Sequence, residues 1–294
     1  MKIFLLSVLS VSAVIFAFFY LKDVYLKRKT FSKGSWLPLT GIGFVTNFFD
    51  TLGIGSFAPT TSFYKFTKLV DDRVIPGTLN IGHCLPVIVQ ALIYIKGVEV
   101  EAVTLISIML AATLGAIIGA GIVCKLPVNK IRIGLGASLL LVAIAMITKN
   151  LFQSEVGAMG LTSWKLIAAI AVSFVFGALQ TIGIGFYAPC MALIFVLGMN
   201  TRSAFPIMSG SCALLMPWAS LKFIKEGAYD AKAAIGLTGL GIVGVLIAAY
   251  IVKTIPLEIL TWVVVVVILY TSVMMFRSVK KKESPATPAE ACQK

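Results

Sequence analysis

The chain has 294 residues, of which 59% are hydrophobic and 13% are charged, and its formal net charge is +13. Soluble domains are about half apolar and about a quarter charged, so this composition excludes an ordinary soluble protein. The Lys and Arg residues cluster in short gaps between apolar runs, so the positive charge indicates membrane orientation rather than nucleic-acid binding. The sequence therefore predicts an all-α polytopic protein of the inner (cytoplasmic) membrane. We expect it to be embedded in the lipid bilayer and to have no nucleic-acid partner.

The first element is an apolar run over residues 5–21. It is close to the roughly 20 residues that a helix needs to cross a bilayer. A basic stretch at 22–33 follows it, and no clear small-x-small cleavage site is present. We therefore expect residues 1–35 to form a retained anchor helix with its N-terminus outside, followed by a basic linker.

A duplicated motif organises the rest of the chain. Residues 50–60 read DTLGIGSFAPT and residues 180–190 read QTIGIGFYAPC, so the frame T-[LI]-G-I-G-x-[FY]-A-P recurs at an offset of 130 residues. Three downstream pairs continue the agreement: Arg73 and Arg202, Pro86 and Pro217, and Pro127 and Pro256. This self-similarity predicts two homologous repeats. We place repeat 1 at 36–150, repeat 2 at 151–277, and a disordered cytoplasmic tail at 278–294.

Each repeat is expected to hold one broken stretch, at 36–70 or 164–199, followed by three transmembrane runs. The runs are 76–95, 101–124 and 129–148 in repeat 1, and 204–224, 230–252 and 256–277 in repeat 2. If each broken stretch is a re-entrant hairpin, 19 of the 25 Lys and Arg residues fall inside, whereas a single crossing places 16 there. The positive-inside rule therefore favours hairpins, inverted repeats and a cytoplasmic C-terminus.

The glycines and prolines of the broken stretches predict a solute site. Non-helical backbone at membrane depth survives only when it is buried in protein or lines a watery cavity. Paired interruptions in two repeats indicate a transporter's substrate site. Helices that restart after Gly55 and Gly185 would present free N–H groups and a positive dipole end, which suits an anion. The alternative is that these residues only kink or pack helices. The expected substrate-binding residues are Asn47, Thr51, Gly53, Gly55, Thr60, Asn80, His83, Gln180, Thr181, Gly183, Gly185, Ser209 and Ser211.

Two ionisable residues, Asp50 and His83, are expected at membrane depth, where such residues are functional candidates by default. Asp50 could bind H⁺ or, together with unwound carbonyls, Na⁺. His83 could change charge near neutral pH, and a neutral packing role is equally open. Because Gln180 replaces Asp50 in the second copy, ion coupling would differ between the repeats.

The two G-I-G-x-x-A-P elements, each followed by a short turn and a Pro/Gly-rich helix, resemble the TauE/SafE family of sulfite and organosulfur-anion exporters over residues 36–277. The resemblance implies transport of sulfite, a sulfonate or a related organic anion across the bacterial inner membrane, driven by an ion gradient or the membrane potential. The extra N-terminal helix and the His83-Cys84 pair depart from the family pattern.

Features typical of catalysis are missing from the sequence, which has no paired acids, no CxxC and no metal-ligand spacing. We therefore expect no enzyme activity, cofactor or metal, and a secondary carrier with a small anionic solute as its partner. An anion channel and a thiol-dependent membrane redox protein using His83 and Cys84 are the alternatives. A homodimer is an open alternative to a monomer.

Overall fold

The computed structural model describes residues 2–31, 35–71, 74–119, 157–181, 183, 185–254, 257–277 and 279, with eight further positions between 129 and 147. Most of the predicted run at 129–148 and of the tail at 278–294 therefore lies outside the described residues, as does part of the basic linker. Within them the chain is helical and contains no β-strand, apart from an isolated bridge between Ala158 and Met199. The predicted all-α class is confirmed for this part.

The helices follow the predicted runs in order. The first part of the chain forms α1 (Lys2–Lys27), η1 (Arg28–Thr30), α2 (Leu37–Thr51), α3 (Phe57–Thr67), α4 (Ile75–Gly97), α5 (Ala102–Leu114) and a π-helical turn, η2 (Gly115–Gly119). The second part forms α8 (Ser163–Thr181), α9 (Tyr187–Val196), η3 (Thr201–Ser203), α10 (Ala204–Glu226), α11 (Ala231–Thr254) and α12 (Leu257–Arg277). Five of these helices (α1, α4, α8, α10 and α11) are long and apolar enough to cross a bilayer. The protein is therefore a multi-pass membrane protein.

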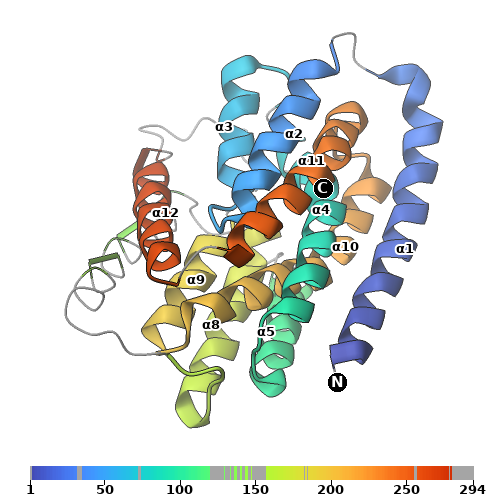
Figure 1. Ribbon diagram of the computed structural model, residues 1–294. Helices are drawn as coiled ribbons and strands as arrows, with labels where there is room; N and C mark the ends of the chain where they lie inside the picture. The colour runs from blue at the N-terminus through green and yellow to red at the C-terminus, as the bar shows by residue number, and fades with distance from the viewer. Residues whose placement is uncertain are drawn as a thin grey trace.

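The two interrupted stretches lie at opposite ends of the molecule. The pair α2 and α3 occupies the upper end in Figure 1, and the pair α8 and α9 occupies the lower part. The first arms of the two stretches differ in length. Helix α2 has 15 residues and α8 has 19, so α8 is by itself long enough to span the hydrocarbon.

The helix packing crosses between the two parts of the chain. Helix α2 packs along α11, α8 packs along α5, and α4 packs against α10 between them. Glycines permit the close approaches: a Cβ on Gly244 of α11 would lie 2.5 Å from the carbonyl oxygen of Phe44 in α2. A Cβ on Gly115, at the end of α5, would collide with the carbonyl oxygen of Phe174 in α8. Small residues at such crossings let membrane helices associate closely without the drive of water exclusion.

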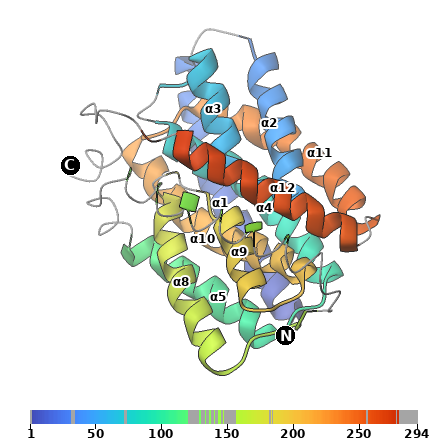
Figure 2. The same cartoon turned by 90° about the vertical axis from the view of Figure 1, so that its left-hand side faces the viewer.

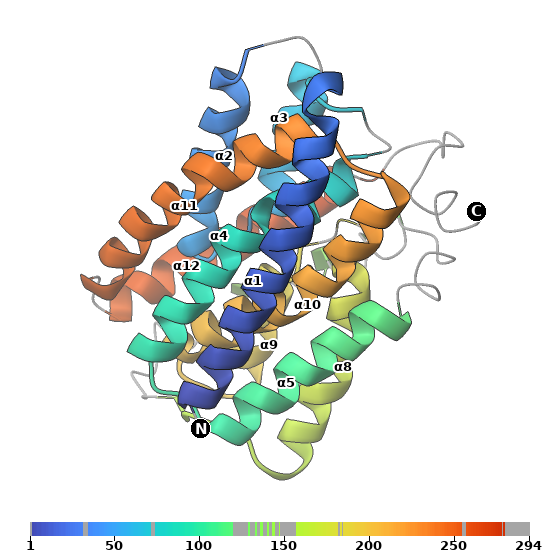
Figure 3. The same ribbon diagram turned by 90° about the vertical axis from the view of Figure 1, so that its right-hand side faces the viewer.

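Helix α1 bridges the two parts of the chain. It packs on both α4 and α10, across which it runs in Figure 3. Pro86 of α4 has no N–H, so the carbonyl of Gly82, four residues earlier, loses its helical donor. The Thr238 hydroxyl of α11 donates to this carbonyl at 2.9 Å, and Tyr20 of α1 lies 3.4 Å from the Thr238 oxygen. The Gly82 carbonyl that Pro86 leaves without a helical donor is therefore hydrogen-bonded by Thr238 of α11, which is itself in contact with Tyr20 of α1.

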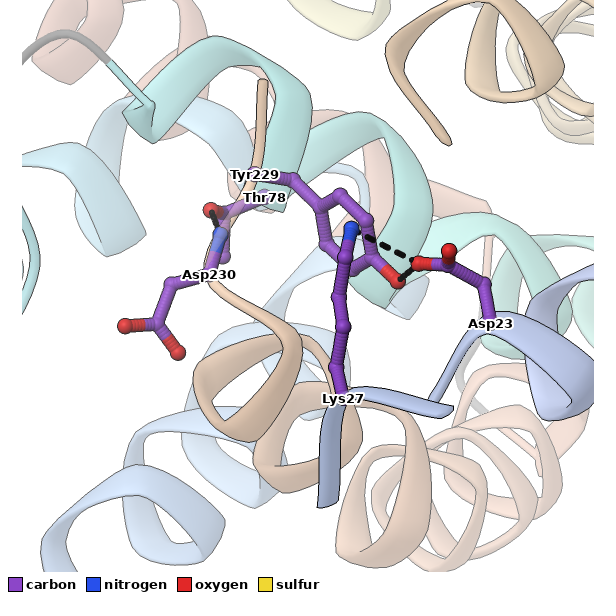
Figure 4. Close-up of polar contacts among 5 residues, drawn as sticks. All are labelled: Asp23, Lys27, Thr78, Tyr229 and Asp230. Carbon is purple, nitrogen blue, oxygen red and sulfur yellow. Dashed lines mark hydrogen bonds and ion pairs between the residues drawn. The ribbon is translucent and has the colours of Figure 1, made fainter. Parts of the chain in front are cut away.

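A polar clamp holds the end of α1 against the loop that precedes α11 (Figure 4). The Tyr229 hydroxyl donates to Asp23 of α1, and Lys27 pairs with the same carboxylate oxygen at 2.8 Å while its ammonium lies 4.4 Å from the Tyr229 ring centroid. In the same loop, the Asp230 N–H donates to the Thr78 hydroxyl of α4 at 2.9 Å. Burial, followed by the hydrogen bond to Asp23, raises the pKa of Tyr229 above its ordinary value. The hydroxyl thus stays protonated as a donor at physiological pH.

Removing the clamp hydroxyl by Tyr229→Phe should lower the free energy of unfolding by roughly 1–2 kcal/mol, because the Asp23 carboxylate then loses a donor in a half-buried site. Thermal unfolding in detergent, followed by intrinsic fluorescence, measures the change. Tyr25→Phe is the matched control, since Tyr25 lies on α1, the helix that carries Asp23, and its side chain is 61% exposed. Equal midpoints for the two variants would contradict a stabilising clamp.

Candidate functional site

Both helix breaks are formed by glycines with left-handed backbone. At the end of α2, Gly53 has φ +100°, its N–H donates to the Asp50 carbonyl at 2.9 Å, and the Ile54 N–H donates to the Phe49 carbonyl at 3.1 Å. This is the Schellman pattern, which satisfies the last carbonyls of a helix. At the end of α8, Gly183 has φ +87° and donates to the Gln180 carbonyl at 3.0 Å. The carbonyls at these helix ends are therefore paired, and the next helices begin with N–H groups that have no acceptor within their own helix.

The two breaks meet at a cavity of about 30 Å³, which has room for about two water molecules. We call residues 50–58 the first tip and residues 180–188 the second tip. Asp50, Gly55 and Ser56 line the cavity from the first tip, Gln180, Gly185 and Phe186 line it from the second, and Thr271 and Met275 line it from α12. The lining among the described residues contains no Lys, Arg or His. Any attraction for an anion must therefore come from neutral donors, namely main-chain N–H groups with their helix dipoles and the side chains of Ser56, Gln180 and Thr271.

The tips face each other reciprocally. A Cβ on Gly55 would lie 3.5 Å from the Cβ of Tyr187, and a Cβ on Gly185 would lie 3.9 Å from the Cβ of Phe57. Gly185 lies 130 positions after Gly55, and Tyr187 lies 130 positions after Phe57. The same pair of positions is thus in contact from both sides of the cavity.

The polar groups of the two tips are nevertheless arranged differently. Asp50 is 2% exposed; its Oδ1 accepts the Ser56 N–H at 2.5 Å, and its Oδ2 has no hydrogen-bond partner in the described part of the chain. Gln180 does not form the equivalent contact, because its Oε1 accepts the thiol of Cys212 at 3.2 Å. An acidic side chain therefore closes the start of α3, and no acidic side chain of the described residues closes the start of α9.

His83 lies apart from the cavity in a network of its own. Its Nδ1 is 2.9 Å from Asn47 Oδ1 and its Nε2 is 3.1 Å from the Thr60 hydroxyl. The Asn47 amide nitrogen donates to the carbonyls of Gly43 and Leu237, so its oxygen must accept from Nδ1–H. The Thr60 hydroxyl also lies 2.7 Å from the Ser56 carbonyl. His83 is thus fully buried and reaches the first tip only through Thr60 and Ser56.

The other predicted residues do not line the cavity. Thr51, Thr181 and Ser209 bond to carbonyls of their own helices, at 2.9, 2.7 and 2.6 Å. Asn80 donates to the Pro76 carbonyl at 2.9 Å, while its Oδ1 and the Ser211 hydroxyl are buried without partners in the described residues. Asp50, Gly55, Gln180 and Gly185 are therefore the predicted residues that the cavity brings together.

Sequence reasoning missed a polar link between the two parts of the chain. The Tyr187 hydroxyl of α9 donates to Gln90 Oε1 of α4 at 3.3 Å, close to Asp50, and Gln90 Nε2 is buried without a partner among the described residues. The signal that could have found Gln90 is a lone amide within an apolar run. Cys84, Cys190 and Cys212 are free, buried thiols, and the described residues contain no group of side chains suited to a metal.

Comparison with known proteins gives a match to a family model. Residues 165–293, which include the second tip, match the family described as sulfite exporter TauE/SafE. Neither a curated protein nor a solved structure gives a significant match to the chain. The family consists of membrane transporters, which agrees with the several apolar helices. The resemblance to the TauE/SafE family is thus confirmed over residues 165–293 of this multi-pass membrane protein.

Proposed function

We propose that the protein is a secondary transporter that moves a small anion, such as sulfite, a sulfonate or a related organic anion, through the cavity between the two tips. The observation that carries this proposal is that Gly55 and Gly185, 130 residues apart, line one cavity at which two helices begin. Free N–H groups at helix starts bind oxyanions. The family match supplies the substrate class, since its members are described as sulfite exporters.

We also propose that the transporter consists of two inverted repeats, 36–150 and 151–277, each with a re-entrant hairpin, preceded by the anchor and linker at 1–35 and followed by a cytoplasmic tail at 278–294. The crossed packing supports the duplication, because the contact of Gly244 with Phe44 recurs as the contact of Gly115 with Phe174. The opposite ends from which α2–α3 and α8–α9 approach the cavity support the inversion (Figures 1 and 2).

Asp50 and His83 are the groups that we propose for ion coupling. With His83 doubly protonated, Nδ1–H donates to Asn47, Nε2–H donates to Thr60, and Thr60 donates to Ser56, so that every group is satisfied. With His83 neutral, Nε2 is an acceptor, and the Thr60 hydroxyl can donate its single proton either to Nε2 or to the Ser56 carbonyl, but not to both. Ser56 in turn donates to Asp50, so the network joins the two ionisable residues.

The proposal is tested by an anion screen on purified protein in liposomes, with sulfite, methanesulfonate, thiosulfate and acetate as probes and mass detection of the trapped anion. We expect saturable flux with counterflow for the sulfur oxyanions and at least about tenfold less for acetate, whose planar carboxylate offers two oxygens rather than three. Single-molecule conductance steps in a planar bilayer would assign a channel instead. No flux of any of the four anions would refute anion transport.

A further inference from the structure

The two tips are equivalent in sequence and unlike in chemistry. At the first tip the Asp50 carboxylate takes the position of a bound anion, because its Oδ1 accepts the Ser56 N–H at the start of α3. Phe186 is the counterpart of Ser56, 130 positions later, and its N–H has no partner among the described residues. The first turn of α9 therefore keeps its free donors, whereas α3 has already used one of its own.

A second observation points to a ligand in the same cavity. Asp50 Oδ2 is buried and has no close hydrogen-bond partner among the described residues; the Tyr187 hydroxyl lies beside the Asp50 carboxyl but donates to Gln90. Asp50 lines the cavity together with Phe186, Tyr187 and Ala188 of the second tip. An ionised Asp50 would repel an anion held there, and the repulsion is strong at low dielectric. A protonated Asp50 would instead present an O–H donor, and hydrogen bonds from acids to oxyanions are short and strong.

We propose that the tips divide the work: the first turn of α9 holds the transported oxyanion, and Asp50 Oδ2 carries a proton that binds and moves with it. This division rests on the proposed anion transport and deepens it. One proton accompanies each anion, so transport of a monovalent anion is electroneutral.

The surroundings of Asp50 favour this assignment of the proton. The titratable groups that face Asp50 are Tyr94 of α4, Tyr187 of α9 and Cys212 of α10, and none of these is a cation that would hold the carboxylate ionised. His83 of α4 is separated from Asp50 by Thr60 and Ser56. The proton that meets the anion is therefore the one on Asp50.

The test uses the full-length protein in liposomes, with methanesulfonate and thiosulfate as probes because both are fully ionised near neutral pH and bring no proton of their own. A trapped pH dye reports proton entry, and mass detection reports the anion. For the wild type we expect an inward proton gradient to accelerate anion uptake, and anion entry to acidify the lumen. Acceleration by a Na⁺ gradient at constant pH, with no acidification, would overturn the proposal.

Two variants separate the roles of the tips. In Asp50→Asn the amide can still accept from Ser56 and donate to the anion, so we expect counterflow to persist while proton entry falls by at least about tenfold. Gln180→Asp places a carboxylate beside the free N–H groups of α9, and should reduce flux at neutral pH by at least about tenfold. Gln180→Asn is the uncharged control. The exchange Asp50→Gln with Gln180→Asp should restore coupled flux, because one carboxylate and one free helix start again share the cavity.

The outcomes distinguish the two proposals. Wild-type flux that ignores the pH gradient, or Gln180→Asp transporting like Gln180→Asn, would overturn the division of work and leave anion transport standing. Absence of flux for every anion in the screen would refute transport itself. Thermal unfolding in detergent confirms that each variant is folded before its flux is compared.

Discussion

Gly185→Leu should abolish anion flux in liposomes while leaving a folded protein. A Cβ at this position would have only Phe57 within 4 Å, at 3.9 Å, and φ of Gly185 lies outside the left-handed region, so the backbone accepts a side chain. The leucine then fills a cavity of about 30 Å³ and covers the start of α9. Gly185→Ala should retain part of the flux, so that flux decreases from glycine to alanine to leucine as the side-chain volume at position 185 increases.

Gly239→Leu is the matched control for this prediction, since Gly239 of α11 is exposed and a Cβ there meets nothing within 4 Å. Gly55→Leu is a less clean test, because φ +82° at Gly55 would strain any side chain. Initial rates of methanesulfonate and sulfite uptake measure the effect. Wild-type rates in Gly185→Leu would exclude the cavity as the path of the anion.

The second large effect is expected on stability, at the crossed helix contacts. Gly244→Ala forces a methyl group to 2.5 Å from the Phe44 carbonyl oxygen, and Gly115→Ala forces one against the Phe174 carbonyl, so backbone must move in both variants. Overpacking of this kind costs about 1–3 kcal/mol. The measurement is thermal unfolding in detergent, with Gly239→Ala as the control.

The two alanine substitutions also test the duplication. If the contacts are equivalent, the two variants should lose similar stability, and because they lie at different interfaces their effects should add in the double variant. A Gly115→Ala variant as stable as Gly239→Ala would show that α5 and α8 can separate at little cost.

Local chemistry made the helix breaks predictable from sequence. Gly53 and Gly183 adopt positive φ, and prolines follow each break at Pro59 and Pro189, so both interruptions are encoded within a few residues. The pairing of Tyr187 with Gln90, 97 positions apart, depends on how α9 packs against α4, which no local pattern specifies. The same holds for Thr238, whose role depends on the carbonyl that Pro86 leaves unpaired in another helix.

The position of His83 depends on tertiary structure that composition does not specify. As the single histidine of an apolar chain it was a natural candidate for the solute site. The side chain of His83 points to Asn47 and Thr60, which lie behind the first tip rather than in the cavity. The neighbours that a residue of α4 meets depend on how this helix, which contains Pro86, packs against α2 and α3, and no local pattern specifies that packing.

The crossed packing determines which parts of the molecule can travel together. Because α2 is joined to α11 and α8 to α5 by glycine contacts, the mechanical units combine segments from both ends of the sequence. A gate that moved one sequence half as a rigid block would have to separate both the interface of α2 with α11 and the interface of α5 with α8. The interface between α4 and α10 lies between these pairs, and both helices reach the cavity, so sliding at this interface would leave both glycine contacts intact.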